Sequence, residues 1–187
     1  MFETILQLDH ALTLGFNHFH TDQLDQLMIL ISGKLTWIPL YALILFLLYK
    51  EYGWKSAAVI LLAIVVNLVL TDQTSVFFKN FFERPRPCHN EEMLKMLNMP
   101  VGCGGKFGFV SSHAANTMGL AVLASYFLQK NWVWLLLLSF ALLNAYSRVY
   151  LGKHFVGDVV GGMFLGWLIA LLVAQMTELL LKKIKQP

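Results

Sequence analysis

Long apolar stretches dominate the pattern of hydrophobic and polar positions along the chain. Each of five stretches approaches or exceeds the roughly 20 residues that a helix needs to cross a bilayer. They run from Leu24 to Tyr49, from Trp54 to Phe78, from His113 to Leu128, from Trp132 to Tyr150 and from Phe155 to Leu181. Strands of a membrane barrel would instead show segments of about ten alternating residues. The pattern therefore predicts an all-α fold, an integral membrane helical bundle of about five transmembrane helices.

The segment 1–22 carries its apolar and polar residues on different faces of a helix. It contains no Lys or Arg up to residue 20, so it lacks the basic start of a signal peptide. This pattern predicts an N-terminal amphipathic helix that lies in the membrane interface. The alternative is a soluble cap packed on the bundle. The apolar positions near one face are Phe2, Ile5, Leu6, Leu12, Phe16 and Phe19.

The composition supports a chain that is embedded in a lipid membrane. Hydrophobic residues make up 57% of the sequence and charged residues 13%, and the mean hydropathy is +0.61. These values exclude a disordered chain, a coiled coil, a disulfide-dense mini-protein and a typical cytosolic enzyme. The net charge of +3 does not predict a nucleic-acid partner, because Lys and Arg cluster only at the C-terminus. We expect residues 1–187 to form one membrane-embedded domain.

The two short connectors and the C-terminal tail are expected on one side of the membrane, because five spans alternate in direction. They carry six Lys between them, which favours the cytoplasmic side by the positive-inside rule. The opposite side carries seven basic residues, so the count favours this orientation only if three of those residues serve function. The segments are Lys50–Lys55, Gln129–Asn131 and Lys182–Lys185.

The longest connector runs from Lys79 to Ser112, and long ordered loops tend to carry function. It contains both cysteines, Cys88 and Cys103. In an oxidising compartment these form a disulfide, and elsewhere they are two free thiols. Their spacing matches no zinc pattern, so no metal site is expected. Lys34 fits no span end: either the first span starts later, or Lys34 faces an aqueous site.

Polar residues at the ends of the spans fall into three groups, all on the predicted non-cytoplasmic side. The groups are residues 79–87, 111–113 and 147–158. Polar side chains near membrane depth are candidates for function, because burying them in lipid is costly. Three distant segments that end on one face predict a composite site.

Basic side chains in the first and third groups suit an anionic ligand. Lys79, Arg86 and Arg148 supply fixed positive charge and donors for a phosphate. Ser111 opens the third span, and the first backbone N–H groups of a helix form an anion site. Taken singly, Lys79 or Arg86 would be a snorkelling anchor and Ser111 an N-cap.

Two histidines supply the chemistry that such a site needs. His154 and Asp158 are four residues apart, so on a helical turn they share a face. The carboxylate would fix the imidazole tautomer and leave the other nitrogen as a nucleophile. His113 lies on a different segment and is available as a general acid. The alternative for His154 and Asp158 is a structural pair.

The order and spacing of these residues resemble the three-part signature of the type 2 phosphatidic acid phosphatase family, membrane phosphatases related to vanadium haloperoxidases. The second part departs from the usual Pro-Ser-Gly-His, since this chain has Val110-Ser111-Ser112-His113. The matching positions are Lys79, six residues, Arg86-Pro87; Ser111 and His113; and Ser147-Arg148, five residues, His154, three residues, Asp158.

The resemblance implies metal-independent dephosphorylation of a lipid through a phosphohistidine intermediate, with no cofactor. His154 would be the nucleophile, Asp158 would orient it, and His113 would protonate the leaving group. The residues implied to hold the phosphoryl oxygens are Lys79, Arg86, Ser111, Ser112 and Arg148.

The resemblance further implies a bacterial cytoplasmic (inner) membrane protein whose active-site loop, residues 79–112, faces the periplasm. The substrate classes it leaves open are undecaprenyl diphosphate, phosphatidylglycerol phosphate, phosphatidic acid and the phosphates of lipid A. A vanadate-dependent haloperoxidase and, less favoured, a non-enzymatic transporter are the alternative functions.

Overall fold

A computed structural model describes residues 2–185. Met1, Gln186 and Pro187 lie outside the described residues, as do the side chains of Phe2, Ile184 and Lys185. Two residues used in the predictions are therefore not described at the level of side chains. They are Phe2, the first residue of the predicted interfacial face, and Lys185, the last Lys of the predicted basic tail.

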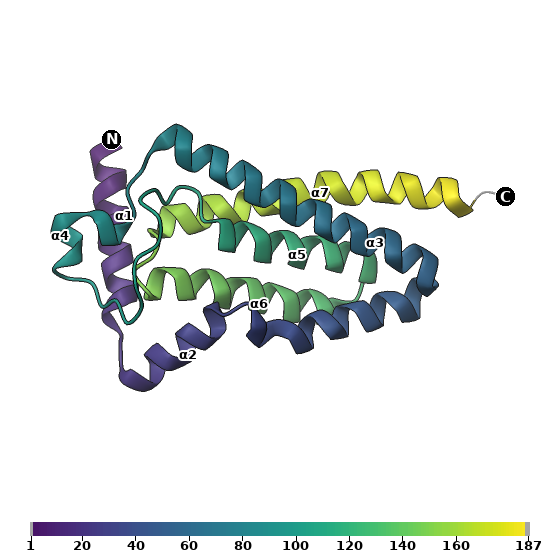
Figure 1. Cartoon of the computed structure of the whole chain (residues 1–187), viewed down its shortest axis with the longest axis horizontal. Coiled ribbons are helices and arrows are strands. Elements are labelled where there is room, and N and C mark those ends of the chain that lie inside the picture. Colours follow the sequence, from purple (N-terminus) through teal and green to yellow (C-terminus); the bar gives the residue numbers. More distant parts are fainter. Residues whose placement is uncertain (1, 186–187) are drawn as a thin grey trace.

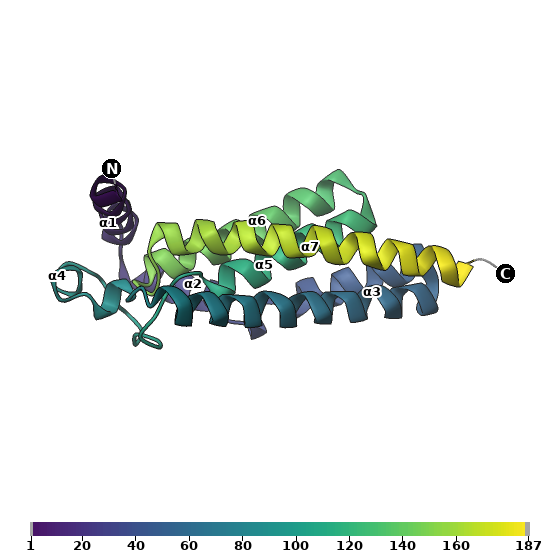
Figure 2. The same ribbon diagram turned by 90° about the horizontal axis from the view of Figure 1, so that it is seen from above.

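Helices account for nearly all regular structure in residues 2–185. Helices α3, α5, α6 and α7 run side by side along the long axis, and α1 crosses one end of them (Figures 1 and 2). This arrangement confirms the all-α membrane bundle predicted from the apolar pattern. The elements are α1 (Phe2–His18), α2 (Asp22–Ser32), the 3-10 turn η1 (Leu35–Trp37), α3 (Ile38–Phe82), the 3-10 turn η2 (Pro87–His89), α4 (Glu91–Leu94), α5 (Ser112–Leu128), α6 (Asn131–Tyr150) and α7 (Val156–Lys185).

Helix α3 consists of two arms joined at a sharp bend. Gly53 has φ 70° and ψ 172°, a conformation that glycine adopts without steric cost. The ribbon turns back on itself there, so that both arms pack beside the bundle (Figure 1). The two arms correspond to the first two predicted spans.

The start of the first predicted span, Leu24, is wrong. Residues Asp22–Ser32 form the separate helix α2, which the Thr21 side chain caps and which ends at Gly33. Its apolar residues extended the hydrophobic run in the sequence, although Gly33 and Lys34 interrupt the helix before η1. The arm that follows begins near Leu35, so Lys34 precedes the span.

The predicted loop from Lys79 to Ser112 is shorter in the structure. Helix α3 continues to Phe82 and ends at Glu83, whose φ of 47° is a left-handed cap. Lys79 therefore lies in the last turn of α3, and Ser112 is the first residue of α5.

Helix α5 is the centre of the bundle. Among the described helices, α3 with η1, α6 and α7 are long and apolar enough to cross a membrane, whereas α5 has only 17 residues. Most of its side chains are nevertheless buried, and its neighbour α7 approaches it closely. A Cβ at Gly162 or Gly166 would collide with backbone oxygens of Ser111 and Ala115. Small residues at such interfaces allow membrane helices to pack closely.

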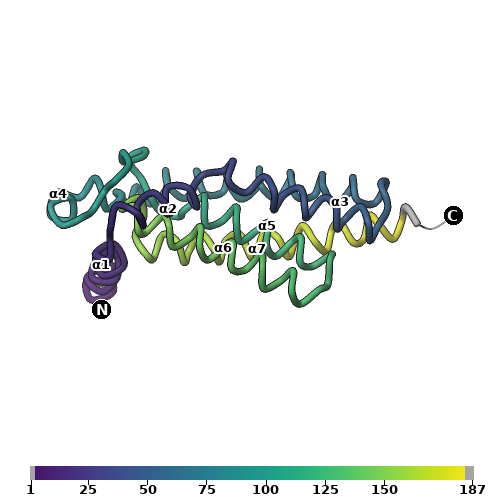
Figure 3. The backbone as a smooth tube through the Cα atoms, turned by 90° about the horizontal axis from the view of Figure 1, so that it is seen from below, coloured from purple at the N-terminus to yellow at the C-terminus, as the bar shows by residue number. Residues whose placement is uncertain are grey.

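Different segments of the chain form the two ends of the bundle. The bend of α3, the turn between α5 and α6 and the end of α7 lie at one end, here called the far end (Figure 1). The ion pair between Lys130 and Glu51, 2.8 Å long, joins two of these segments. Helices α1, α2 and α4 lie at the opposite end, here called the site end (Figure 3).

Helix α1 turns its polar face to the bundle. Thr13 and Asn17 are buried there. Its apolar face points away from the bundle, and the interfacial position of this helix stays a prediction. The exposed apolar side chains of this segment are Ile5, Leu8, Leu12, Phe16 and Phe19.

Candidate active site

The predicted His–Asp pair lies where α6 connects to α7, with His154 in the turn and Asp158 in the first turn of α7. The His154 side chain is almost fully buried, and its Nδ1 lies 3.4 Å from Oδ2 of the fully buried Asp158. The same Oδ2 accepts the backbone N–H of Phe155 at 3.1 Å. Gly108 packs so closely that a Cβ there would lie 2.7 Å from this oxygen. The carboxylate is thus fixed on one edge of the imidazole.

Burial lowers the pKa of His154 well below its usual value. The positive charges of Arg86, Arg148 and Lys79 lower this pKa further, and a backbone hydrogen bond with Gly108 opposes them. The imidazole is therefore neutral at neutral pH, and its second nitrogen keeps the lone pair that a nucleophile requires.

Three cationic side chains from three different segments face this turn. Arg86, in the loop after α3, donates from Nε to the Phe107 carbonyl at 3.2 Å and from Nη1 to the Lys153 carbonyl at 3.3 Å. Burial lowers the pKa of Arg86, and the charge of Asp158 opposes this effect. The guanidinium remains protonated and is anchored by two backbone carbonyls.

Arg148 and Lys79 complete the cationic group. Arg148 is 7% exposed and donates from Nη1 to Ser32 Oγ at 2.5 Å. Its Nε is buried and has no hydrogen-bond partner among the described residues. Lys79, in the last turn of α3, donates from Nζ to Ser112 Oγ. A buried donor without a partner is costly, so Arg148 is suited to an incoming anion.

The N-terminus of α5 lies against the same turn. The Ser111 backbone N–H donates to the Asp158 carbonyl at 2.9 Å, and Ser111 Oγ caps the helix through the N–H of Ala114. Ser112 and His113 form the first turn of α5. The structure therefore brings together all the predicted site residues from the three sequence groups.

Sequence reasoning missed two residues, Arg84 and Asp9. Arg84 Nη1 donates to Asp158 Oδ1 at 2.8 Å, and its Nη2 donates to Asp9 Oδ2 at 2.6 Å. The guanidinium also lies over the ring of Phe155, 4.2 Å from its centroid. The only sequence signal was the position of Arg84 within the first polar group. Nothing local connects it to an acidic residue of α1.

A cavity of about 640 Å³ adjoins the first turn of α5, between the arms of α3 and helices α5 and α6. Its polar lining includes His113, Ser112 and Lys34, and much of the rest is apolar. Lys34 precedes the first arm, which confirms the first part of its predicted alternative, and it also lines this cavity. The apolar lining includes Trp37, Ile44, Leu61, Ile64, Leu68, Leu120 and Phe140.

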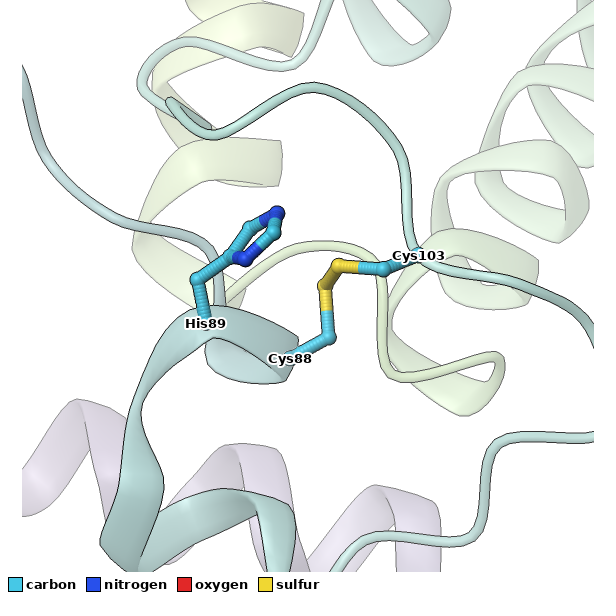
Figure 4. Close-up of side chains that lie close together, drawn as sticks. All are labelled: Cys88, His89 and Cys103. Carbon is cyan, nitrogen blue, oxygen red and sulfur yellow. A yellow bond between two sulfur atoms is a disulfide. The ribbon is translucent and has the colours of Figure 1, made fainter.

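Cys88 and Cys103 form a disulfide with a Cα–Cα distance of 5.9 Å (Figure 4). The nearby His89 ring lies within hydrogen-bond distance of the Gly104 carbonyl, at 3.3 Å. In residues 2–185 these three side chains are the only grouping with the proximity of metal ligands. Because the sulfurs are joined to each other, they are not the thiolates that a metal would bind. The bond closes residues 88–103, and Phe107, whose carbonyl accepts from Arg86 Nε, follows four residues after Cys103.

Together, a helical membrane bundle, a buried His–Asp pair, three cations and a helix N-terminus define an enzyme scaffold for phosphate chemistry. The family model of the PAP2 superfamily matches residues 52–181, and the chain belongs to this superfamily. This confirms the predicted family and the prediction that the protein is an enzyme, a membrane phosphatase.

Relatives cover almost the whole chain. A lipid A 4'-phosphatase of Bacteroides thetaiotaomicron is 35% identical over 95% of this chain and 82% of its own length. One of Porphyromonas gingivalis is 35% identical over 89% of this chain and 72% of its own length. The crystal structure of a PAP2 type phosphatidylglycerolphosphate phosphatase from Bacillus subtilis aligns with a TM-score of 0.73 at 26% identity. That alignment covers 98% of this chain and 89% of the other.

Proposed function

We propose that the protein hydrolyses a lipid-linked phosphate through a phosphohistidine intermediate formed on His154, without a metal ion. The observation that carries this proposal is the junction of two environments at the first turn of α5. The buried pair His154–Asp158 and its cations lie on one side, and the cavity lined by His113 lies on the other. The first environment suits a phosphate, and the second suits the apolar chains of the lipid that leaves.

In the first chemical step, the neutral imidazole of His154 attacks phosphorus, and the P–O bond to the lipid breaks. Asp158 orients the ring and stabilises the positive charge that develops on it. His113 donates a proton to the leaving oxygen. The side chains that stabilise the phosphoryl oxygens are Lys79, Arg86, Ser111, Ser112 and Arg148.

In the second step, water attacks the phosphohistidine and the P–N bond breaks. His113, deprotonated by the first step, accepts a proton from the attacking water, as microscopic reversibility requires. Inorganic phosphate then leaves, and His154 is again neutral. Among residues 2–185, the groups that face His154 are nitrogen and hydroxyl donors and the carboxylate of Asp158, a set that suits an anion better than a divalent cation.

The apolar cavity supports a lipid as the substrate. Its volume of about 640 Å³ is within the range of ligand sites, and it would take apolar chains of the lipid whose phosphate is removed. Among the four candidate classes, we favour the 4'-phosphate of lipid A. The two relatives described above, which match most of this chain, bear that name.

The proposed setting is a bacterial cytoplasmic membrane, with residues 1–187 as one catalytic domain. The segment 1–22 would lie in the outer interface, and the loop within residues 79–112 would face the periplasm. The disulfide in this loop supports an oxidising compartment, and the Lys residues of the far end support a cytoplasmic location there. A C-terminal reporter that is active only in the periplasm would contradict this orientation.

Phosphate release by the detergent-solubilised protein tests the activity. The panel contains lipid A, phosphatidylglycerol phosphate, phosphatidic acid and undecaprenyl diphosphate, each with and without a chelator. We expect release in the chelator, with the highest kcat/KM for lipid A. No release from any of the four substrates would overturn the proposal, and release from another lipid would change only the substrate class.

A further inference from the structure

Helix α1 contacts the active-site turn through one carboxylate, that of Asp9. Its Oδ1 accepts the backbone N–H of Gly157 at 2.8 Å, and its Oδ2 accepts Nη2 of Arg84 at 2.6 Å. The side chain is 12% exposed. A single residue of the N-terminal helix therefore holds both the first turn of α7 and the guanidinium that binds Asp158.

The first turn of α7 depends on α1 for its cap. The N–H of Val156 donates to Thr13 Oγ1 at 3.1 Å, and Thr13 in turn donates to the Asp9 carbonyl at 2.7 Å. The N–H groups at a helix start need such partners, which neighbouring residues of the same chain segment usually supply. Here Thr13 and Asp9 supply them from 143 and 148 residues earlier in the chain.

Arg84 extends this contact to the catalytic pair. It bridges Asp9 and Asp158, and its 20% exposure keeps both ion pairs partly shielded from water. Asp158 accepts from Arg84 through one oxygen and faces His154 with the other. A displacement of Arg84 would therefore change the position and the charge balance of the group that orients the nucleophile.

We propose that Asp9 is a positioning residue of the active site. Through Arg84 and the first turn of α7, it holds Asp158, and with it His154, in the geometry for attack on phosphorus. This inference rests on the proposed function of His154. Because the opposite face of α1 is apolar and exposed, the helix that completes the site is also the one suited to contact lipid.

The decisive variant is Asp9→Asn, which keeps an oxygen for the Gly157 N–H but removes the charge that binds Arg84. We expect kcat to fall about 10- to 100-fold while KM changes less than twofold, because misplacement of a reacting group affects the transition state more than substrate binding. The matched control is Glu3→Gln, the same type of change at an exposed position of α1, which should leave kcat within twofold.

Inhibition constants separate positioning from a general loss of structure. Vanadate forms a trigonal-bipyramidal adduct that resembles the transition state, whereas inorganic phosphate resembles the product. In Asp9→Asn the Ki for vanadate should rise by about the factor that kcat falls, and the Ki for phosphate should stay within twofold. Thr13→Val removes one cap and leaves Arg84 in place, so it should give the same pattern with a smaller factor.

All variants are assayed as the full chain, and only on fractions that elute with the wild type in size-exclusion chromatography. A kcat within twofold for Asp9→Asn would overturn the inference, as would equal changes in both Ki values. His154→Ala serves as the separate test of the proposed function. If it keeps activity, the proposed function fails, and if it loses activity while Asp9→Asn does not, only the role of Asp9 fails.

Discussion

Two ion pairs of equal length mark opposite ends of the bundle. Arg84 Nη1 lies 2.8 Å from Asp158 Oδ1 at the site end, and Lys130 Nζ lies 2.8 Å from Glu51 Oε2 at the far end. The side chains of Arg84 and Asp158 are 20% and 0% exposed, whereas those of Lys130 and Glu51 are 38% and 47% exposed. The two pairs differ in their surroundings and not in their geometry.

The difference shows why the few charges of this chain have unequal importance. At the far end, water screens the pair and solvates each partner when the other is removed. At the site end, removal of one partner leaves the other charge without solvent, which is strongly destabilising. We therefore expect substitutions at the site end to change both activity and stability, and those at the far end to leave activity unchanged and to change stability much less.

The largest effect is expected from His154→Ala. The variant removes the proposed nucleophile, so kcat should fall by about 10⁴-fold or more. The cavity and the cations remain, so lipid binding, measured as the Kd of a non-hydrolysable phosphonate lipid, should change less than threefold. A variant whose kcat stays within tenfold of the wild type would show that His154 is not the nucleophile.

Arg84→Gln breaks the buried pair and should have the next largest effect. Asp158 would lose its closest cation, which costs about 3 kcal/mol of stability at a buried site. Such a loss lowers the Tm by about 6–12 °C for a chain of this size. Tryptophan fluorescence of the protein in detergent measures this change. A Tm within 2 °C of the wild type would show that the pair at the site end is solvated like the one at the far end.

A substitution in the cavity should weaken binding of the lipid substrate and leave the chemical step unchanged. Leu68→Trp places a larger side chain in the cavity and should raise KM for a long-chain lipid phosphate about tenfold. The kcat for a short soluble aryl phosphate should change less than twofold. The control is Leu62→Trp on the same arm of α3, where the side chain is 63% exposed and does not line the cavity. Equal KM values in the two variants would contradict a lipid site there.

The pH profile should show a smaller effect that reports the burial of His154. Burial and the neighbouring cations lower the pKa of His154. The neutral, nucleophilic imidazole therefore persists at pH values below about 6.5, the ordinary pKa of histidine. Activity is present above the folded pKa and is lost as the pH falls through it. The acid limb of kcat/KM that reports His154 should therefore be centred below pH 6.5. An acid limb centred at pH 6.5 or above would mean that the site is hydrated.

The sequence predicted the local part of the site and missed the tertiary part. His154 and Asp158 were found together because residues four apart share a helical face, and the apolar runs located the spans between the polar groups. Arg84 and Asp9 were missed because 75 residues separate them, and only the packing of α1 on the bundle brings them together. The false start of the first span at Leu24 arose because hydropathy does not register the break at Gly33 and Lys34.

The smallest effect is expected from Lys130→Gln at the far end. The pair with Glu51 joins the bend of α3 to the turn between α5 and α6, but both side chains are largely solvated. Exposed pairs of this kind contribute about 0–1 kcal/mol, so the Tm should fall by less than about 4 °C and kcat should stay within twofold. Raising the salt concentration should remove even this difference between variant and wild type, because ions screen exposed charges. A larger loss of Tm that persists in high salt would show that the far end is packed as tightly as the site end.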